Sequence, residues 1–301
     1  MSTKYILFNA IAGNGKCKSD AEALAARIDN SSLINMARIN SYATFFEGLD
    51  PTDELIICGG DGTLNRFVND TAGISVENPI YYYAVGSGND FARDLGHALH
   101  DEPDFRIDSC LKSLPVVTVD GKQFSFINGI GYGIDGYCCE VGDKLRAENE
   151  NNHSDKPINY TAIAIKGLLF HYKPKNAVVT VDGVRREFKK VWLAPTMFGR
   201  YYGGGMMPTP AQDRNSEDKK VSLMVFHGSG KLKTLMIFPS IFTGEHVKHT
   251  KQISVFEGKE ITVEYDRPAP LQIDGETILG VSRYSVSAEA KAEKKAAAAA
   301  K

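Results

Sequence analysis

Short apolar runs alternate with stretches of helical periodicity along the first part of the chain. The apolar runs predict β-strands at Lys4–Asn9, Ser32–Asn35, Leu55–Cys58 and Ile80–Val85. The helical periodicity predicts helices at Asp20–Ile28 and Leu64–Thr71, with another opening near Asn89. Strands separated by helices of this length are typical of βαβ units and a parallel sheet. We therefore expect residues 1–115 to form an α/β domain.

From Pro115 the pattern changes to many short alternating segments. Strands are predicted at Val116–Val119, Phe124–Asn128, Ala177–Val181, Phe188–Ala194, Val221–Phe226, Ile261–Tyr265 and Arg283–Ser287. Asp-Gly dipeptides separate some of them, as in hairpins. Helical patterns interrupt the strands at Ile134–Asn149 and Asn159–His171. Residues 116–287 therefore predict an antiparallel β-rich domain, and residues 288–301 form a tail of little but Ala, Lys and Glu.

Composition narrows the classes of function. The 35 basic and 37 acidic side chains nearly balance, so no global field attracts nucleic acid, which we do not expect as a partner. No signal-like segment opens the chain, and no apolar run reaches the ~20 residues that cross a bilayer. We expect a cytoplasmic protein, with any membrane contact peripheral.

Five cysteines without a CxxC pair predict reduced thiols. His246 and His249 lack the spacing of a zinc site and are predicted at the surface.

The most informative segment is Leu55–Asn65, an apolar strand that leads through Gly-Gly-Asp-Gly-Thr into a helix. Three glycines in four positions leave backbone N–H groups uncovered, so phosphate oxygens can approach them at a helix N-terminus. Phosphates repel the carboxylate of Asp61 unless a cation lies between them, so Mg²⁺ or a substrate hydroxyl is its natural partner. The competing interpretation is a structural turn whose aspartate caps the helix.

Two further glycine-rich turns follow predicted strands, at residues 9–16 and 86–90. Turns at the carboxyl ends of parallel strands meet at one edge of the sheet, where open α/β folds bind ligands. Two other glycine patterns are rejected. Residues 10–17 lack the first glycine and the final hydroxyl of a Walker A loop. The GxGxxG of residues 131–136 lies in the β-rich half, without a βαβ unit around it.

GGDGT, GSGNDFAR, FINGIGYGID and a late DGE, in this order and spacing, resemble the diacylglycerol kinase catalytic-domain family. The chain is most similar to its soluble bacterial lipid kinases, which are related to sphingosine kinases. The resemblance extends from Asn9 to about Glu276. It implies a Rossmann-like α/β nucleotide-binding domain joined to an antiparallel β-sandwich domain, with ATP and Mg²⁺ in the cleft. The implied activity is transfer of the γ-phosphate of ATP to the hydroxyl of diacylglycerol or a related lipid, such as a sphingoid base.

The resemblance assigns roles to individual residues. Asp61 and Glu276 are the catalytic candidates, and either fits the general base; we favour Glu276 as base and Asp61 as magnesium organiser. The predicted nucleotide-binding set is Asn9, Gly13, Gly15, Lys16, Gly59, Gly60, Asp61, Gly62, Thr63, Gly86, Ser87, Asn89, Asp90, Asp274 and Glu276. A structural magnesium site of the family corresponds to residues 216–222, where two lysines now stand beside the acids. Asp213 and Asp218 are the candidate ligands.

The lipid side is less defined. Apolar residues 160–172 and the glycine-aromatic stretch 198–207 are candidates for an acyl-chain pocket, although core packing explains the first equally well. Seven basic residues are candidates for a face toward anionic headgroups: Lys166, Lys173, Lys175, Arg185, Arg186, Lys189 and Lys190. Two rival functions stay open, an NAD kinase-like small-molecule kinase and a catalytically silent nucleotide- or lipid-binding regulator. A homodimer is the commonest symmetric assembly and is also open.

Overall fold

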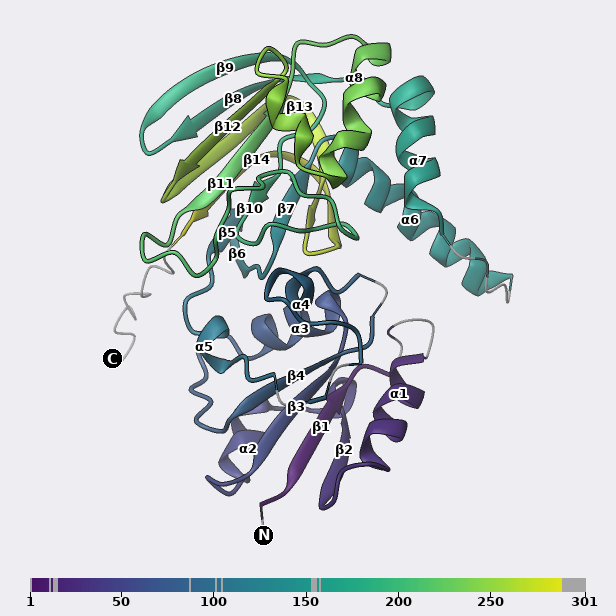
Figure 1. The fold of residues 1–301 in the computed structure, drawn as a ribbon, viewed down its shortest axis with the longest axis vertical. Helices are drawn as coiled ribbons and strands as arrows, with labels where there is room; N and C mark the ends of the chain where they lie inside the picture. The colour runs from purple at the N-terminus through teal and green to yellow at the C-terminus, as the bar shows by residue number, and fades with distance from the viewer. Residues whose placement is uncertain are drawn as a thin grey trace, which may run out of the picture.

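The computed structural model describes residues 2–288, apart from residues 11, 13–15, 87, 101, 104, 153–155 and 157 and the side chain of residue 150. Figure 1 shows an α/β domain that holds the N-terminus and, beyond it, a β-rich domain flanked by helices. The expected fold class is confirmed.

The first domain contains a four-stranded parallel sheet. Its strands are β1 (Lys4–Phe8), β2 (Ser31–Asn35), β3 (Glu54–Gly59) and β4 (Ile80–Ala84), in the order β2-β1-β3-β4. The helical elements are α1 (Lys16–Ala25), the 3₁₀ turn η2 (Met36–Arg38), α2 (Tyr42–Glu47), α3 (Asp61–Asp70), α4 (Asp90–Asp94) and α5 (Asp108–Leu111). The carboxyl ends of the strands point toward the second domain (Figure 1). The continuous apolar run of β3 reflects burial on both faces of this sheet.

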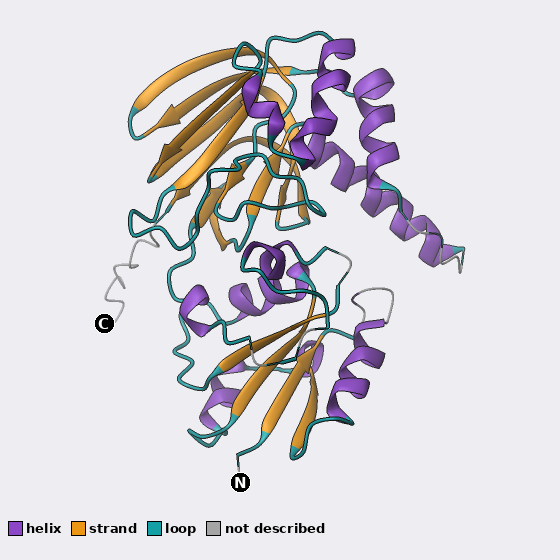
Figure 2. Ribbon diagram, in the orientation of Figure 1, coloured by secondary structure: helices purple, strands orange, loops and turns teal. Residues whose placement is uncertain are grey.

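The second domain contains a ten-stranded antiparallel sheet (Figure 2). Its strands are β5 (Val116–Val119), β6 (Lys122–Ser125), β7 (Gly129–Tyr132), β8 (Lys175–Val181), β9 (Val184–Val191), β10 (Thr196–Met197), β11 (Val221–Phe226), β12 (Ile253–Gly258), β13 (Glu260–Ile273) and β14 (Glu276–Ser287). The main path runs β12-β11-β10-β7-β13-β14-β5-β6, and β8 joins β13 to β9. Strand β13 pairs with three strands. It pairs with β14 along most of its length, with β8 through residues 261–265 and with β7 through residues 271–273.

Helices cover one side of the second domain (Figure 2). They are α6 (Ile134–Asn151), α7 (Tyr160–Lys166), the π-helical turn η3 (Gly167–His171), α8 (Lys231–Ile237) and the 3₁₀ turns η4 (Phe238–Phe242) and η5 (Glu245–Lys248). Asn159 caps α7, because its side chain accepts a hydrogen bond from the Ala162 N–H at 2.9 Å. No helix within the described residues is long and apolar enough to span a membrane.

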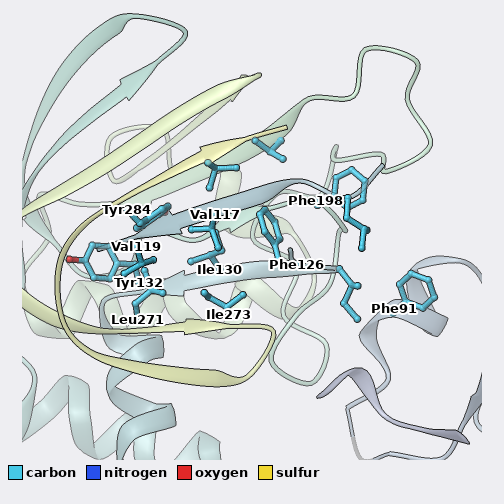
Figure 3. Close-up of a cluster of buried hydrophobic side chains, with 14 of the residues drawn as sticks. Phe91, Val117, Val119, Phe126, Ile130, Tyr132, Phe198, Leu271, Ile273 and Tyr284 are labelled. Carbon is cyan, nitrogen blue, oxygen red and sulfur yellow. The ribbon is translucent and has the colours of Figure 1, made fainter. Parts of the chain in front are cut away.

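One hydrophobic cluster joins the two domains. It contains Phe91 of α4 together with Phe126, Phe198, Tyr132 and Tyr284 of the second domain. Figure 3 shows it running from the inner strands of the second sheet toward Phe91. Because this apolar cluster is continuous, the two domains share packed side chains.

Three details differ from the expectations. Helix α1 begins at Lys16, because Cys17, Ala21 and Leu24 form its buried face. The strand predicted at Phe124–Asn128 stops at Ser125, since the following backbone amides bond to a carboxylate described below. His246 is buried rather than at the surface: its Nε2 lies 2.8 Å from the Pro208 carbonyl oxygen, and burial lowers its pKa. All five cysteines are free, as expected.

Candidate active site at the domain junction

The Gly-Gly-Asp-Gly-Thr turn joins β3 to α3 at the edge of the sheet that faces the second domain. Around Gly62, no described atom beyond its chain neighbours and its own helix backbone lies within 4 Å of the position a Cβ would occupy. This glycine therefore leaves open space at the N-terminus of α3, as an approaching anion requires. Thr63 points the other way: it is buried over Gly59, and its hydroxyl has no hydrogen-bond partner among the described residues.

The turn after β4 packs directly against this first turn. A Cβ on Gly86 would lie 2.5 Å from the Cα of Gly60, so glycine is required there by the close approach of two backbones. The Asn89 side chain fixes the second turn, since its Oδ1 accepts a hydrogen bond from the Gly86 N–H at 3.2 Å. The two turns thus form one rigid unit, as their positions on neighbouring strands predicted.

Asp61 holds the first turn of the next helix. Its carboxylate accepts hydrogen bonds from the backbone N–H groups of Asp90, at 2.8 Å, and Phe91, at 3.1 Å. It therefore caps α4 rather than its own helix. Burial, and then the nearby charge of Asp90, raise the pKa of Asp61 to about 7, and the charge of Asp274 adds to this effect. A group with this pKa is half protonated near neutral pH and gains from a nearby cation.

Asp90 reaches across to the second domain. Its Oδ2 accepts a hydrogen bond from the Gly204 N–H at 2.8 Å, in a loop where Gly203, Gly204 and Gly205 all have positive φ. Burial raises the pKa of Asp90. The glycine-aromatic segment 198–207 thus contacts the second turn of the candidate nucleotide site.

The hairpin between β13 and β14 contributes Asp274 and Glu276 from the second domain. Asp274 and Gly275 have φ of 46° and 98°, as the tight turn of such a hairpin requires. The Asp274 carboxylate accepts four hydrogen bonds, from the N–H groups of Ile127, Asn128 and Gly129 and from the Asn65 side chain, at 2.6–2.9 Å. Burial nevertheless raises its pKa. Glu276, two residues later, is exposed.

A buried ion pair next to this site was not predicted. Arg214 donates from Nε to Asp94 at 2.5 Å, and also to the Ile127 carbonyl and the Asn128 side chain at 3.1 and 3.0 Å. Its guanidinium lies against the ring of Phe91 at 4.7 Å. The pair joins α4 to the second domain. Its only signal in the sequence is a lone arginine between two predicted metal ligands.

Those two ligands, Asp213 and Asp218, have other contacts. Asp213 accepts a hydrogen bond from the Asn215 N–H at 2.9 Å, and Asp218 pairs with Lys220 at 3.1 Å. Within the described residues, no three His, Cys, Asp or Glu side chains gather as a metal site. The structural magnesium site stays a prediction, without a supporting cluster.

A groove beside the site was also not predicted. It has a volume of about 840 Å³ and opens where β1 and β2 end, next to Phe8, Ala10 and Asn35. Arg38, Asn40 and Ser41 contribute its polar wall. The sequence offered one signal for this groove. Residues 36–41 directly follow a predicted strand, so they are expected at the edge of the sheet where the glycine turns lie.

The remaining predicted residues have mixed outcomes. Asn9 lies at the end of β1, and Lys16 begins α1 with an exposed side chain. Gly13, Gly15 and Ser87 lie outside the described residues.

The rejected GxGxxG segment has a structural explanation. A Cβ on Gly131 would lie 1.4 Å from the Asp135 carboxylate, and one on Gly136 would lie 2.1 Å from the Pro270 carbonyl oxygen. These glycines serve close packing around Asp135. That buried carboxylate accepts a hydrogen bond from the Gln272 side chain at 2.8 Å, and burial raises its pKa to about 6. Gln272 also accepts a hydrogen bond from the Gly275 N–H at 2.6 Å, so it links α6 to the hairpin of Glu276.

Comparison with known proteins places this site in a family. The model of the diacylglycerol kinase catalytic domain matches residues 4–118, and that of the YegS C-terminal NAD kinase beta sandwich-like domain matches residues 130–290, more than half of the chain. The diacylglycerol kinase of Mycobacterium tuberculosis is 23% identical over 273 residues, which cover 86% of this chain and 84% of that protein. The diacylglycerol kinase of Bacillus subtilis is 24% identical over 229 residues, with coverages of 74% and 71%.

A solved structure shows the same fold. The crystal structure of a diacylglycerol kinase from Bacillus anthracis superposes with a TM-score of 0.55 at 17% sequence identity and covers 95% of this chain and 94% of that one. The expected family is therefore confirmed: this chain belongs to the diacylglycerol kinase catalytic-domain family, the lipid kinases, which are phosphotransferases, and its second domain is of the YegS C-terminal type.

Proposed function

We propose that this chain transfers the γ-phosphate of ATP to the hydroxyl of diacylglycerol or a closely related lipid, such as a sphingoid base, in phospholipid metabolism. One observation carries the proposal. Asp61 lies beside the open space at Gly62 and accepts a hydrogen bond from the Asp90 N–H, and Asp274 of the second domain accepts one from Asn65 of the same helix α3. Burial and the charges of Asp90 and Asp274 raise the pKa of Asp61. Phosphoryl transfer depends on positioning and charge neutralisation, which this combination supports.

The nucleotide fits the first domain. The groove bounded by Arg38, Asn40 and Ser41 has room for the adenosine, and the N–H groups near Gly62 are available to the phosphates. Lys16, the exposed first residue of α1, would lie at the same edge of the sheet. Both ends of an ATP molecule then lie along the carboxyl ends of neighbouring strands.

Asp61 is the candidate ligand of Mg²⁺ in this site. This ion needs only one or two protein carboxylates when substrate phosphates supply other ligands. Asp61, whose pKa is raised to about 7, would hold it, and the bound ion would neutralise the phosphate charge that develops in transfer. Asp90 holds the glycine loop of residues 203–205, and Asp274 holds the backbone of residues 127–129.

Glu276 is proposed as the general base that takes the proton from the lipid hydroxyl. It is exposed at the end of the hairpin, whereas the oxygens of Asp61 already accept two backbone hydrogen bonds. Asp61 would orient the nucleotide. We also propose that the protein contacts a membrane peripherally, because the acceptor is a bilayer lipid.

The test is a phosphorylation assay with labelled ATP and Mg²⁺ on diacylglycerol, a sphingoid base, monoacylglycerol and a polyprenol in mixed micelles, with NAD as a separate acceptor. We expect transfer to one of the lipids and none to NAD. Transfer to NAD would instead support the NAD kinase-like alternative. ATP binding without turnover on any acceptor would support the silent regulator.

A further inference from the structure

Three large apolar side chains are strongly exposed at one side of the second domain. Phe170 of η3 is 72% exposed, and Leu232 and Met236 of α8 are 76% and 81% exposed. Leu232 and Met236 are four residues apart, so they lie on the same face of α8. The Lys231 ammonium donates to the Leu169 carbonyl oxygen at 2.7 Å, which joins α8 to η3 next to Phe170. Apolar patches of this kind mark interaction sites.

The two segments that carry these apolar side chains hold only basic charges. Residues 160–175 and 228–244 contain five lysines and no aspartate or glutamate, although the chain has 37 acidic residues. Lys166, Lys173, Lys231 and Lys233 are exposed, and within the described part of the chain none of them pairs with a carboxylate. Lysines around an apolar surface match the interface of an anionic bilayer, where the side chains sit below headgroups that attract the ammonium groups.

We propose that this α8 face, formed by Phe170, Leu232, Met236 and the four exposed lysines, docks on an anionic lipid bilayer. A second copy of the chain fits it less well, because a two-fold interface would oppose its lysines with the same lysines. Helix α8 contacts η3, which continues α7, and both α7 and η3 pack on α6. Asp135 of α6 connects through Gln272 to the hairpin of Glu276. The docking itself does not depend on the proposed function. Only its purpose does, which is to bring the active site to a lipid substrate in the bilayer.

The basic strand β9 is the competing surface. It carries Arg185, Arg186, Lys189 and Lys190, but Arg185 pairs with Glu187 at 2.6 Å. Arg186 stacks on the ring of Phe256 at 4.7 Å. The exposed apolar side chain of β9 is Val184, which is smaller than those of the α8 face. The α8 face therefore combines more apolar area with less internal neutralisation.

The test is sedimentation of the whole protein, without ATP, with phosphatidylcholine vesicles that do or do not contain phosphatidylglycerol. We expect binding only to the anionic vesicles. L232D/M236D lowers the vesicle affinity at least about tenfold. K231Q/K233Q lowers it about fivefold for each lysine at low salt, and the difference shrinks as salt is added. The matched controls on β9, V184D and R185Q/R186Q, bind like the wild type.

Two results would overturn the docking surface: vesicle affinity unchanged in L232D/M236D, or affinity lost in R185Q/R186Q instead. A wild type that is dimeric by light scattering and an L232D/M236D variant that is monomeric would assign the face to self-association and also overturn it. Melting temperatures equal to the wild type establish that the variants are folded. Vesicle binding does not require turnover, so a protein that docks as described but phosphorylates no lipid would refute the proposed function alone.

Discussion

Two glycine-aspartate turns meet at the junction, one from each domain, and they use their carboxylates differently. In the turn after β3, Asp61 accepts two backbone hydrogen bonds from α4 and lies next to the open space at Gly62. In the hairpin between β13 and β14, Asp274 accepts four hydrogen bonds and joins Asn65 of the first domain to residues 127–129 of the second. The exposed carboxylate of the hairpin is Glu276. The same residue types thus place an acid beside open space in one turn, and a hydrogen-bonded structural acid followed by an exposed one in the other.

Removing the charge of Asp61 tests the first turn with the largest expected effect. Asp61→Asn keeps an oxygen that accepts a hydrogen bond from α4 but removes the charge proposed to organise Mg²⁺. We expect kcat to fall at least about 10³-fold while the variant still folds and unfolds cooperatively. Steady-state kinetics and thermal unfolding check this, and near-normal kcat would refute the role.

Glu276→Gln tests the free acid of the hairpin. A general base contributes about 10²–10⁴-fold, so kcat should fall within that range while ATP affinity stays close to that of the wild type. Glu264→Gln, on an exposed part of the same strand pair, is the matched control. An equal loss in both variants would show that the effect is not specific to the hairpin.

Asp274→Ala tests the structural acid. It leaves buried backbone donors at residues 127–129 without their partner, so the free energy of unfolding should fall by about 3–5 kcal/mol. Urea denaturation measures it. If Asp274→Ala instead retained full stability and lost only turnover, Asp274 would belong with the chemical residues and the contrast between the turns would disappear.

Two glycines, Gly62 in the turn after β3 and Gly86 in the turn after β4, sharpen the contrast at a finer level. Gly86→Ala forces a Cβ to within 2.5 Å of the Gly60 backbone and should cost about 1–3 kcal/mol of stability. Gly62→Ala enters open space, so stability should hold while ATP affinity falls. Unfolding curves and ATP titrations of the pair separate packing from access, and equal stability losses would contradict this division.

The smallest expected effect is a pH dependence that belongs to Asp61. Its pKa is about 7 in the folded protein and about 3.9 in an unfolded chain, so the folded state binds the proton more tightly. The stability from this group is fully present below pH ~4 and is lost as the pH rises through about 7. The free energy of unfolding of the wild type, relative to Asp61→Asn, should fall by about 2.5 kcal/mol between pH 5 and 8. A constant difference across this range would contradict the raised pKa.

The sequence by itself determined the two-part architecture and the position of the glycine turns. The apolar run of β3 is followed by Gly59 and Gly60 and then by a helical pattern. This order of residues is typical of a buried parallel strand that leads through a turn into a helix. The alternation after Pro115 likewise predicted antiparallel strands. Local periodicity encodes these features, because each depends on residues close together in the chain.

Only the tertiary structure decided what each carboxylate contacts. The partners of Asp274 are about 145 and 209 residues away, and Arg214 reaches Asp94 over 120 residues. Such contacts leave no periodic signal. Burial of His246 and exposure of Leu232 and Met236 have the same cause: short apolar segments look alike in sequence, and which face is covered depends on which distant element packs against it.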